Sequence, residues 1–164
     1  MGRALRLHRR QLAAALLCAA PWPAAAQASG GVTMPAFTVA VTLSPRAAES
    51  LAAASEGITV VAFYTGEATR AARRQANQMG QISLATRRVA IPGRPGTASF
   101  PAIPVSAAKL NNVQGRRLDL LVNVYSSRLS NADNLLDCGI FQDTVQAAAA
   151  SSPLQIACKL IEEM

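Results

Sequence analysis

The chain has little histidine, few aromatic side chains and few cysteines, and these shortages limit the chemistry that it can carry out. Its 164 residues include one histidine, one tryptophan and three cysteines, and 4% of them are aromatic. His8 and Trp22 both fall within the first 28 residues, which have the pattern of a signal peptide. A mature chain without histidine cannot form a Ser-His-Asp triad, a Cys-His dyad or a histidine metal site. We therefore expect a protein that is not an enzyme and that needs no cofactor.

The first 28 residues predict export. Four arginines precede an apolar run from Leu12 to Ala20, which is too short to span a bilayer. Ala26-Gln27-Ala28 then provides the small residues of a processing site, and Ala24-Ala25-Ala26 provides an alternative site two residues earlier. We expect cleavage after Ala28 and a mature chain of residues 29 to 164. The product would be periplasmic or secreted, with no membrane anchor after cleavage.

Two details of this segment concern the route of export and lipid attachment. The pair Arg9-Arg10 before the apolar run leaves the twin-arginine route open. An ordinary secretory signal is favoured, because paired arginines are common in such regions. Cys18 follows Leu17, whereas a bacterial lipidation signal requires a small residue before the cysteine, so we exclude lipid anchoring.

Removal of the signal peptide also changes the charge balance. The whole chain has 16 basic and 9 acidic residues and a net charge of +7, but four of the basic residues lie in the signal peptide. The mature chain therefore carries +3, which argues against nucleic-acid binding when aromatic side chains are so few. An envelope protein or a small ligand is the expected partner.

Alternating apolar residues bounded by turn-forming residues predict a mainly β protein. Pro101 and Pro104 place one of the strands at a sheet edge, because proline cannot donate to a β-ladder. We predict a single-domain antiparallel β-sandwich with one or two short helices, and a partly open barrel is the alternative. The expected strands span residues 37–43, 58–64, 81–91, 97–105, 118–125 and 154–161.

Two short helices are expected between these strands. Ser44 and Pro45 suit the N-cap and the first position of a helix that continues to Ala54. Asp143 and Gln146 have the spacing of a capping box before an alanine-rich run. Residues 106 to 117 are expected to form a loop.

The stretch from Leu118 to Cys158 contains both cysteines of the mature chain. Cys138 and Cys158 form an even pair in an exported protein, so we expect a disulfide bond between them. Closing a loop of about twenty residues would stabilise the fold by about 3 kcal/mol. A catalytic pair is disfavoured, because the spacing is not Cys-x-x-Cys and Cys158 lies on an apolar strand face.

Two sets of side chains are candidates for contact with a ligand or partner. Arg70, Arg73 and Arg74 lie at helical spacing in a polar stretch. They would suit an anion, but a solvated face is the favoured interpretation of such a run of charges. Core packing explains most aromatic residues of the chain. Tyr64 and Tyr125 each lie near a polar loop at a strand end, and we keep them as contact candidates.

Acidic and amide side chains between residues 131 and 143 allow two further interpretations. Asn131, Asp133, Asn134 and Asp137 are oxygen donors on a loop, as calcium requires, but their spacing does not match a calcium-binding loop. Turn-forming residues that bond their own backbone are the favoured explanation. Asp133, Asp137 and Asp143 could otherwise serve an envelope hydrolase as paired carboxylates, although the sequence predicts no separation between them.

Two parts of the chain resemble uncharacterised small exported bacterial proteins. Residues 43 to 66 have a strand, a Ser-Pro-initiated helix and the strand Gly-Ile-Thr-Val-Val-Ala-Phe-Tyr. Residues 118 to 141 contain Val-Asn-Val-Tyr-Ser and Asp-Asn-Leu-Leu-Asp-Cys-Gly-Ile-Phe. Such proteins look like transthyretin-like or immunoglobulin-like sandwiches. The resemblance implies a fold but identifies no catalytic or binding residue.

These observations predict a non-catalytic binding or interaction module of the bacterial envelope. Two alternatives remain open. The first is an envelope hydrolase or calcium-dependent protein that uses the loop from Asn131 to Asp143. The second is a structural subunit that pairs its proline-bearing edge strand with a partner.

Overall fold

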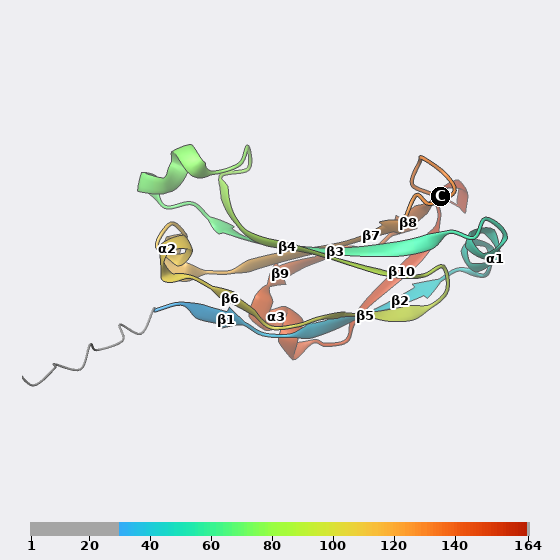
Figure 1. The fold of residues 1–164 in the computed structure, drawn as a ribbon, viewed down its shortest axis with the longest axis horizontal. Helices are drawn as coiled ribbons and strands as arrows, with labels where there is room; N and C mark the ends of the chain where they lie inside the picture. Colours follow the sequence, from blue (N-terminus) through green and yellow to red (C-terminus); the bar gives the residue numbers. More distant parts are fainter. Residues whose placement is uncertain (1–29, 164) are drawn as a thin grey trace, which may run out of the picture.

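The computed structural model describes residues 30 to 163, and this part of the chain is mainly β (Figure 1). The expected signal peptide at residues 1 to 28 lies outside the described residues. Two four-stranded sheets face each other as two layers, and a short two-stranded pair joins β1 (Val32–Met34) to β6 (Ile103–Val105). The structure thus confirms the expected sandwich-like architecture.

The first layer, here called the β2 sheet, has the strand order β5-β2-β10-β8. Its pairs are antiparallel except β2 and β10, which run parallel with Val39 opposite Leu154. Parallel neighbours need a crossover connection, and here nearly the whole chain lies between the two strands. The strands are β2 (Phe37–Leu43), β5 (Gly96–Phe100), β8 (Leu136–Cys138) and β10 (Leu154–Leu160).

The second layer, here called the β3 sheet, is fully antiparallel with the order β4-β3-β7-β9. One register shift between Tyr64 and Thr65 marks a β-bulge in the long β3-β4 pairing. Beyond it the two strands continue into residues 65 to 83, which we call the hairpin extension. The strands are β3 (Gly57–Glu67), β4 (Gln81–Pro92), β7 (Asp119–Ser126) and β9 (Phe141–Thr144).

Short helices connect several of the strands. In α1 (Pro45–Ala53) the hydroxyl of Ser44 accepts a hydrogen bond from the Ala47 N–H, as expected for an N-cap followed by proline. In α3 (Val145–Ala150) the cap is the Thr144 hydroxyl and not Asp143, which lies in β9. Asp143 instead accepts a hydrogen bond from the N–H of Thr144.

Helical content in the described residues is somewhat greater than expected. The predicted loop at 106 to 117 contains α2 (Ala107–Leu110), which Ser106 caps, and the 3₁₀ helix η2 (Gln114–Arg116). Such single turns are too short for periodicity to reveal them. Two further 3₁₀ helices are η1 (Arg70–Gln75) and η3 (Ile161–Glu163).

The structure divides one predicted strand region, and it places the residues on either side of Gly139 in strands of different sheets. The region 97 to 105 breaks at Pro101 into β5, at the edge of the β2 sheet, and β6, which pairs with β1. The segment that follows Leu136 breaks at Gly139, so that β8 belongs to the β2 sheet and β9 to the β3 sheet. The chain therefore crosses between the layers at this point.

The core lies between the two sheets and is filled by alternate residues of the strands. Val39 and Val41 of β2 and Val60 of β3 are buried, as are Val122 and Val124 of β7. A residue in these strands faces the core or the outside according to its place in this alternation.

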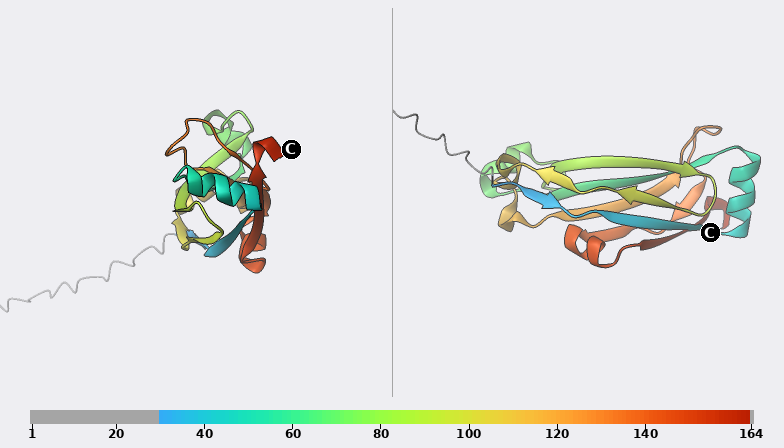
Figure 2. Two further views of the ribbon diagram at one scale, coloured as in Figure 1. Left: turned by 90° about the vertical axis from the view of Figure 1, so that its right-hand side faces the viewer. Right: turned by 60° about the horizontal axis from the view of Figure 1, so that its bottom comes forward.

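The sandwich is elongated, and loops extend it at both ends (Figures 1 and 2). The hairpin extension that contains η1 rises above the outer face of the β3 sheet at one end. The loop between β7 and β8 rises above the same face at the other end, near α1 and the C-terminus. The outer face of the β3 sheet therefore lies between two raised loops.

Candidate functional site

A row of side chains crosses the outer face of the β3 sheet. Phe63 of β3 lies opposite Leu121 of β7, and Leu121 lies opposite Gln142 of β9. Phe63 is followed by Tyr64, which is buried on the inner face, so Phe63 points outward. Phe63 and Leu121 are only half-buried. They form an apolar floor on the face of the sheet that is not covered by the second layer.

The hairpin extension forms a wall beside this floor. The side-chain Oδ1 of Asn77 accepts hydrogen bonds from the N–H groups of Met79 and Gln81, at 2.9 and 3.0 Å. The Asn77 N–H in turn donates to the carbonyl of Gln81 at 2.9 Å. These bonds hold the turn at the tip, where Gly80 has a φ of 76° that favours glycine. Met79 is thereby fixed in an exposed position, with 71% of its surface accessible.

Floor and wall enclose two adjoining cavities, which we call the hairpin hollow. The smaller has a volume of about 240 Å³, and its lining includes Phe63, Leu121, Met79 and Gln142. The larger has a volume of about 590 Å³ and is more open, and Glu67 and Arg73 contribute to its lining. Residues common to both cavities are Asn77, Met79, Gln81 and Asp119. The hollow combines an apolar base with a polar and charged rim.

The charges at this rim are partly compensated. The Arg117 guanidinium donates from Nε to Oδ1 of Asp119 at 3.0 Å. This hydrogen bond and the nearby negative charge raise the pKa of Arg117. Within residues 30 to 163, Arg73 forms no ion pair. Arg73 therefore brings an available positive charge to the larger cavity.

The three arginines predicted as an anion-binding set all lie on η1 and are exposed. Arg73 lines the hairpin hollow, whereas Arg70 and Arg74 are on the same turn but do not line it. Tyr125 lies on the outer face of the β3 sheet, and the guanidinium carbon of Arg128 is 5.8 Å from the centre of its ring. Tyr125 is therefore placed where a contact with a partner is feasible.

Tyr64 is placed differently, because it belongs to the inner face of β3. Only 1% of its surface is exposed, and its ring centre lies 6.4 Å from that of Phe37. Burial raises the pKa of the Tyr64 phenol to about 12, although the charge of Arg87 acts in the opposite direction. The hydroxyl has no hydrogen-bond partner among the described residues. Tyr64 therefore does not present its ring to the surface, whereas its neighbour Phe63 points outward.

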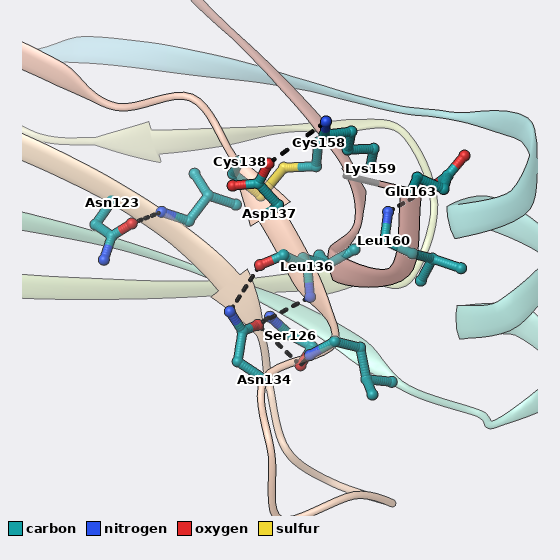
Figure 3. The surroundings of a disulfide bond; sticks show 12 residues. Asn123, Ser126, Asn134, Leu136, Asp137, Cys138, Cys158, Lys159, Leu160 and Glu163 are labelled. Carbon is teal, nitrogen blue, oxygen red and sulfur yellow. Dashed lines mark hydrogen bonds and ion pairs between the residues drawn. A yellow bond between two sulfur atoms is a disulfide. The ribbon is translucent and has the colours of Figure 1, made fainter.

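The oxygen donors considered for calcium do not converge on one point. Asn131 Oδ1 accepts from the N–H of Asp133 at 2.9 Å, as in an Asx turn. Asn134 bonds the backbone of Ser126 and Leu136, and Asp137 lies 3.8 Å from Lys159 (Figure 3). No cluster of three or more acidic, histidine or cysteine side chains suited to a metal occurs between residues 30 and 163. These residues are engaged in local structure.

The carboxylates considered for hydrolysis also lie apart in the fold. Asp137 is in β8 of the β2 sheet, and Asp143 is in β9 of the β3 sheet. Asp133 lies in the loop before β8 and is exposed. The topology thus distributes them over two layers and a loop.

The two cysteines are joined as expected. Cys138 in β8 and Cys158 in β10 lie directly opposite each other in the antiparallel pairing, and their sulfur atoms are 2.08 Å apart (Figure 3). The bond fastens the short edge strand β8 to the centre of the β2 sheet. It therefore also fixes the point from which the chain crosses to β9 in the other layer.

Sequence reasoning missed one buried charge. The Glu56 carboxylate, only 4% exposed, accepts hydrogen bonds from the N–H groups of Gly57, Leu129 and Ser130 and from the Ser130 hydroxyl. Burial raises the pKa of Glu56, but these four donors outweigh it and lower the pKa to about 2. No spacing in the sequence connects Glu56 with a loop more than seventy residues away.

No family model matches the chain, and no curated protein or solved structure is significantly similar to it. The resemblance to transthyretin-like or immunoglobulin-like proteins remains a prediction. Between residues 30 and 163, no helix is long and apolar enough to cross a membrane.

Proposed function

We propose that the protein is an exported, non-catalytic binding module of the bacterial envelope that holds a small amphipathic ligand in the hairpin hollow. The observation that carries the proposal is the apolar floor of Phe63 and Leu121 on an uncovered sheet face. Small-molecule sites are concave and mainly apolar, with a few polar groups that orient the ligand. The smaller cavity of the hairpin hollow has this composition, and the larger cavity adds polar and charged groups.

The rim indicates the chemistry of the ligand. Gln81 and Gln142 offer amide groups that can both donate and accept hydrogen bonds, and Arg73 offers a cation. The smaller cavity, at about 240 Å³, suits one or two rings or a short aliphatic chain. A ligand with an apolar body and a polar or anionic end matches both parts.

Two features support export of the binding module to an oxidising compartment. A disulfide bond persists in the periplasm or outside the cell, whereas cytosolic thiols stay reduced. The pair Cys138 and Cys158 is joined in the structure, and the first 28 residues have the composition of a signal peptide. We therefore place the binding module in the periplasm or among secreted proteins.

The proposal can be tested with an amphipathic anion of suitable size. We would titrate the ¹⁵N-labelled mature protein with 1-anilinonaphthalene-8-sulfonate and follow amide shifts by NMR. The largest shifts are expected at Phe63, Leu121 and Gln142, since these residues line the smaller cavity. Shifts centred on another part of the molecule would contradict the proposal.

Two variants make the test specific. Phe63→Ser removes one of the two apolar side chains of the floor, and Phe63 points away from the core. The variant should bind the probe about tenfold more weakly. Ala157→Ser changes an exposed position on the outer face of the β2 sheet and serves as the control. Equal affinity of both variants and the unmodified protein would show that the hollow does not hold the probe.

A further inference from the structure

Charge is unevenly distributed along the long axis of the sandwich. One end is formed by η1, α2 and η2, which lie together at the same extremity in Figure 1. The N–H of Thr69 donates to the carbonyl of Asn112 at 2.9 Å, and the Asn112 side chain donates to that of Gln75 at 3.3 Å. These bonds join the hairpin extension to the α2-η2 segment in one surface.

This surface, which we call the basic end, carries six cations. All six side chains are exposed. Lys109 and Arg116 donate to the uncharged oxygens of Leu84 and Asn111, and only Arg117 is bonded to a carboxylate within residues 30 to 163. The acidic side chains in this half of the molecule are Glu67, Asp119 and Asp143. The cations of the basic end are Arg70, Arg73, Arg74, Lys109, Arg116 and Arg117.

The opposite end has the reverse balance. It comprises α1, the β4-β5 turn, the loop before β8, and the C-terminal residues around η3. That end carries four cations and six carboxylates, and the carboxylate of Glu56 is buried. The cations are Arg46, Arg94, Arg128 and Lys159, and the carboxylates are Glu49, Glu56, Asp133, Asp137, Glu162 and Glu163.

An exposed apolar side chain accompanies the basic end. Met79 lies in the turn at the tip of the hairpin extension, which rises clear of the β3 sheet in Figure 1. It is 71% exposed, although a methionine is normally buried. The Asn77 side chain holds the tip in this position through two hydrogen bonds. The hydrogen bonds of the turn therefore keep the Met79 side chain exposed.

We propose that the basic end docks the protein on an anionic lipid surface, with Met79 entering the headgroup region. Cations on three separate segments suit a diffuse negative surface, which needs no matching shape. Peripheral membrane proteins insert apolar side chains into the membrane–water interface next to cations that contact the lipid headgroups. A folded acidic protein would instead call for a broader apolar patch at the centre of the contact.

This inference goes beyond the proposed function and does not depend on it. Arg70, Arg74 and Arg116 belong to the basic end but do not line the hairpin hollow. Phe63 lines the hollow but does not belong to the basic end. Variants at these positions therefore separate the two proposals.

The test is sedimentation of the mature exported protein with lipid vesicles. We expect binding to phosphatidylcholine vesicles that contain about one third phosphatidylglycerol, little binding to pure phosphatidylcholine, and a decrease in binding as salt screens the charges. The triple variant Arg70→Gln/Arg74→Gln/Arg116→Gln should bind the anionic vesicles roughly 100-fold more weakly. Met79→Ser should weaken binding severalfold, and Phe63→Ser should leave it unchanged.

A matched control removes the same number of charges from the other end. Arg46→Gln/Arg94→Gln/Arg128→Gln has the same net charge as the first triple variant and should retain most of the binding. Equal losses in both triple variants would overturn the proposal, because net charge alone would then govern binding. The absence of any preference for anionic vesicles would overturn it as well.

A last arm distinguishes lipid from other acidic partners. We would compare immobilised polyaspartate and dextran sulfate with the anionic vesicles at equal salt. Binding that depends on Arg70, Arg74 and Arg116 but occurs on these polymers and not on vesicles would overturn the lipid assignment. Binding that favours vesicles and depends on Met79 supports it.

Discussion

The Oε2 atom of Glu56 accepts hydrogen bonds from both the backbone N–H and the hydroxyl of Ser130, at 2.9 Å each, although the residues are 74 positions apart. Its Oε1 atom accepts from the N–H groups of Leu129 and Gly57. One buried carboxylate thus fastens the β7-β8 loop to the start of β3. The loop borders the outer face of the β3 sheet because of this attachment.

Replacement of Glu56 by Gln should destabilise the protein by about 2 kcal/mol, because charge-assisted hydrogen bonds are lost in a buried place. Guanidinium unfolding would measure the change. Amide exchange at Leu129 and Ser130 should accelerate, since their N–H groups lose a charged acceptor. Glu49→Gln, on the exposed face of α1, is the control and should change stability little.

The same carboxylate predicts a dependence of stability on pH. The pKa of Glu56 falls from its ordinary value of 4.5 to about 2 in the folded protein, so the folded state favours the ionised form. The ionised Glu56 therefore contributes fully to the free energy of unfolding above about pH 5, and this contribution is lost as the pH falls towards 2. Unfolding free energies measured across this range should decline less steeply for Glu56→Gln. Identical slopes for the two proteins would contradict the assignment.

Asn134 should contribute more to stability than Asn131, although both precede β8. The Asn134 side chain accepts from the N–H groups of Ser126 and Leu136 and donates to the Leu136 carbonyl (Figure 3). Asn131 makes one exposed bond, to Asp133. Asn134→Ala should cost about 2 kcal/mol and Asn131→Ala less than about 1 kcal/mol. Added calcium should not raise the melting temperature of either variant or of the parent protein.

Removal of the disulfide bond should lower stability by about 3 kcal/mol, because the bond closes a loop in the unfolded chain. The variant to compare is Cys138→Ser/Cys158→Ser, measured by denaturant unfolding. The parent protein under reducing conditions should unfold at nearly the same denaturant concentration as the variant. An unchanged midpoint in the double variant would show that β8 is held by its other contacts alone.

Tyr64→Phe should raise stability by about 1 kcal/mol. The phenol oxygen is buried without a hydrogen-bond partner among the described residues, and phenylalanine would keep the ring while removing that polar atom. Thermal unfolding would measure the gain. Tyr125→Phe, at a half-exposed position, is the control and should be nearly neutral. A loss of stability in Tyr64→Phe would indicate that the hydroxyl is bonded after all.

Local patterns predicted much of the β2 sheet and its surroundings. Alternation identified β2 and β10, and Ser44 with Pro45 placed the start of α1, because these features depend on residues close together in the sequence. The disulfide pairing followed from the even number of cysteines in an exported chain. The arginines of η1 were identified as a group, although only Arg73 reaches the hairpin hollow.

The hairpin hollow itself could not be predicted in this way. Tyr64 and Phe63 are adjacent aromatic residues in one strand, and only the direction of the core decides which of them faces outward. The β-bulge and the Asn77 turn then decide where the hairpin extension stands beside Phe63 and Leu121. The cavity arises from strands that meet only in the folded sheet.

Composition and short-range order thus determined the mainly β class, the expected export and the cysteine pairing, since each depends on residue types or nearest neighbours. Tertiary structure alone decided the parallel β2-β10 pair, the passage of the chain from β8 to β9, and the bond between Glu56 and Ser130. It also collected the cations of η1, α2 and η2 at one end. The physical reason is that packing energy depends on contacts between distant segments, and no local pattern records those contacts.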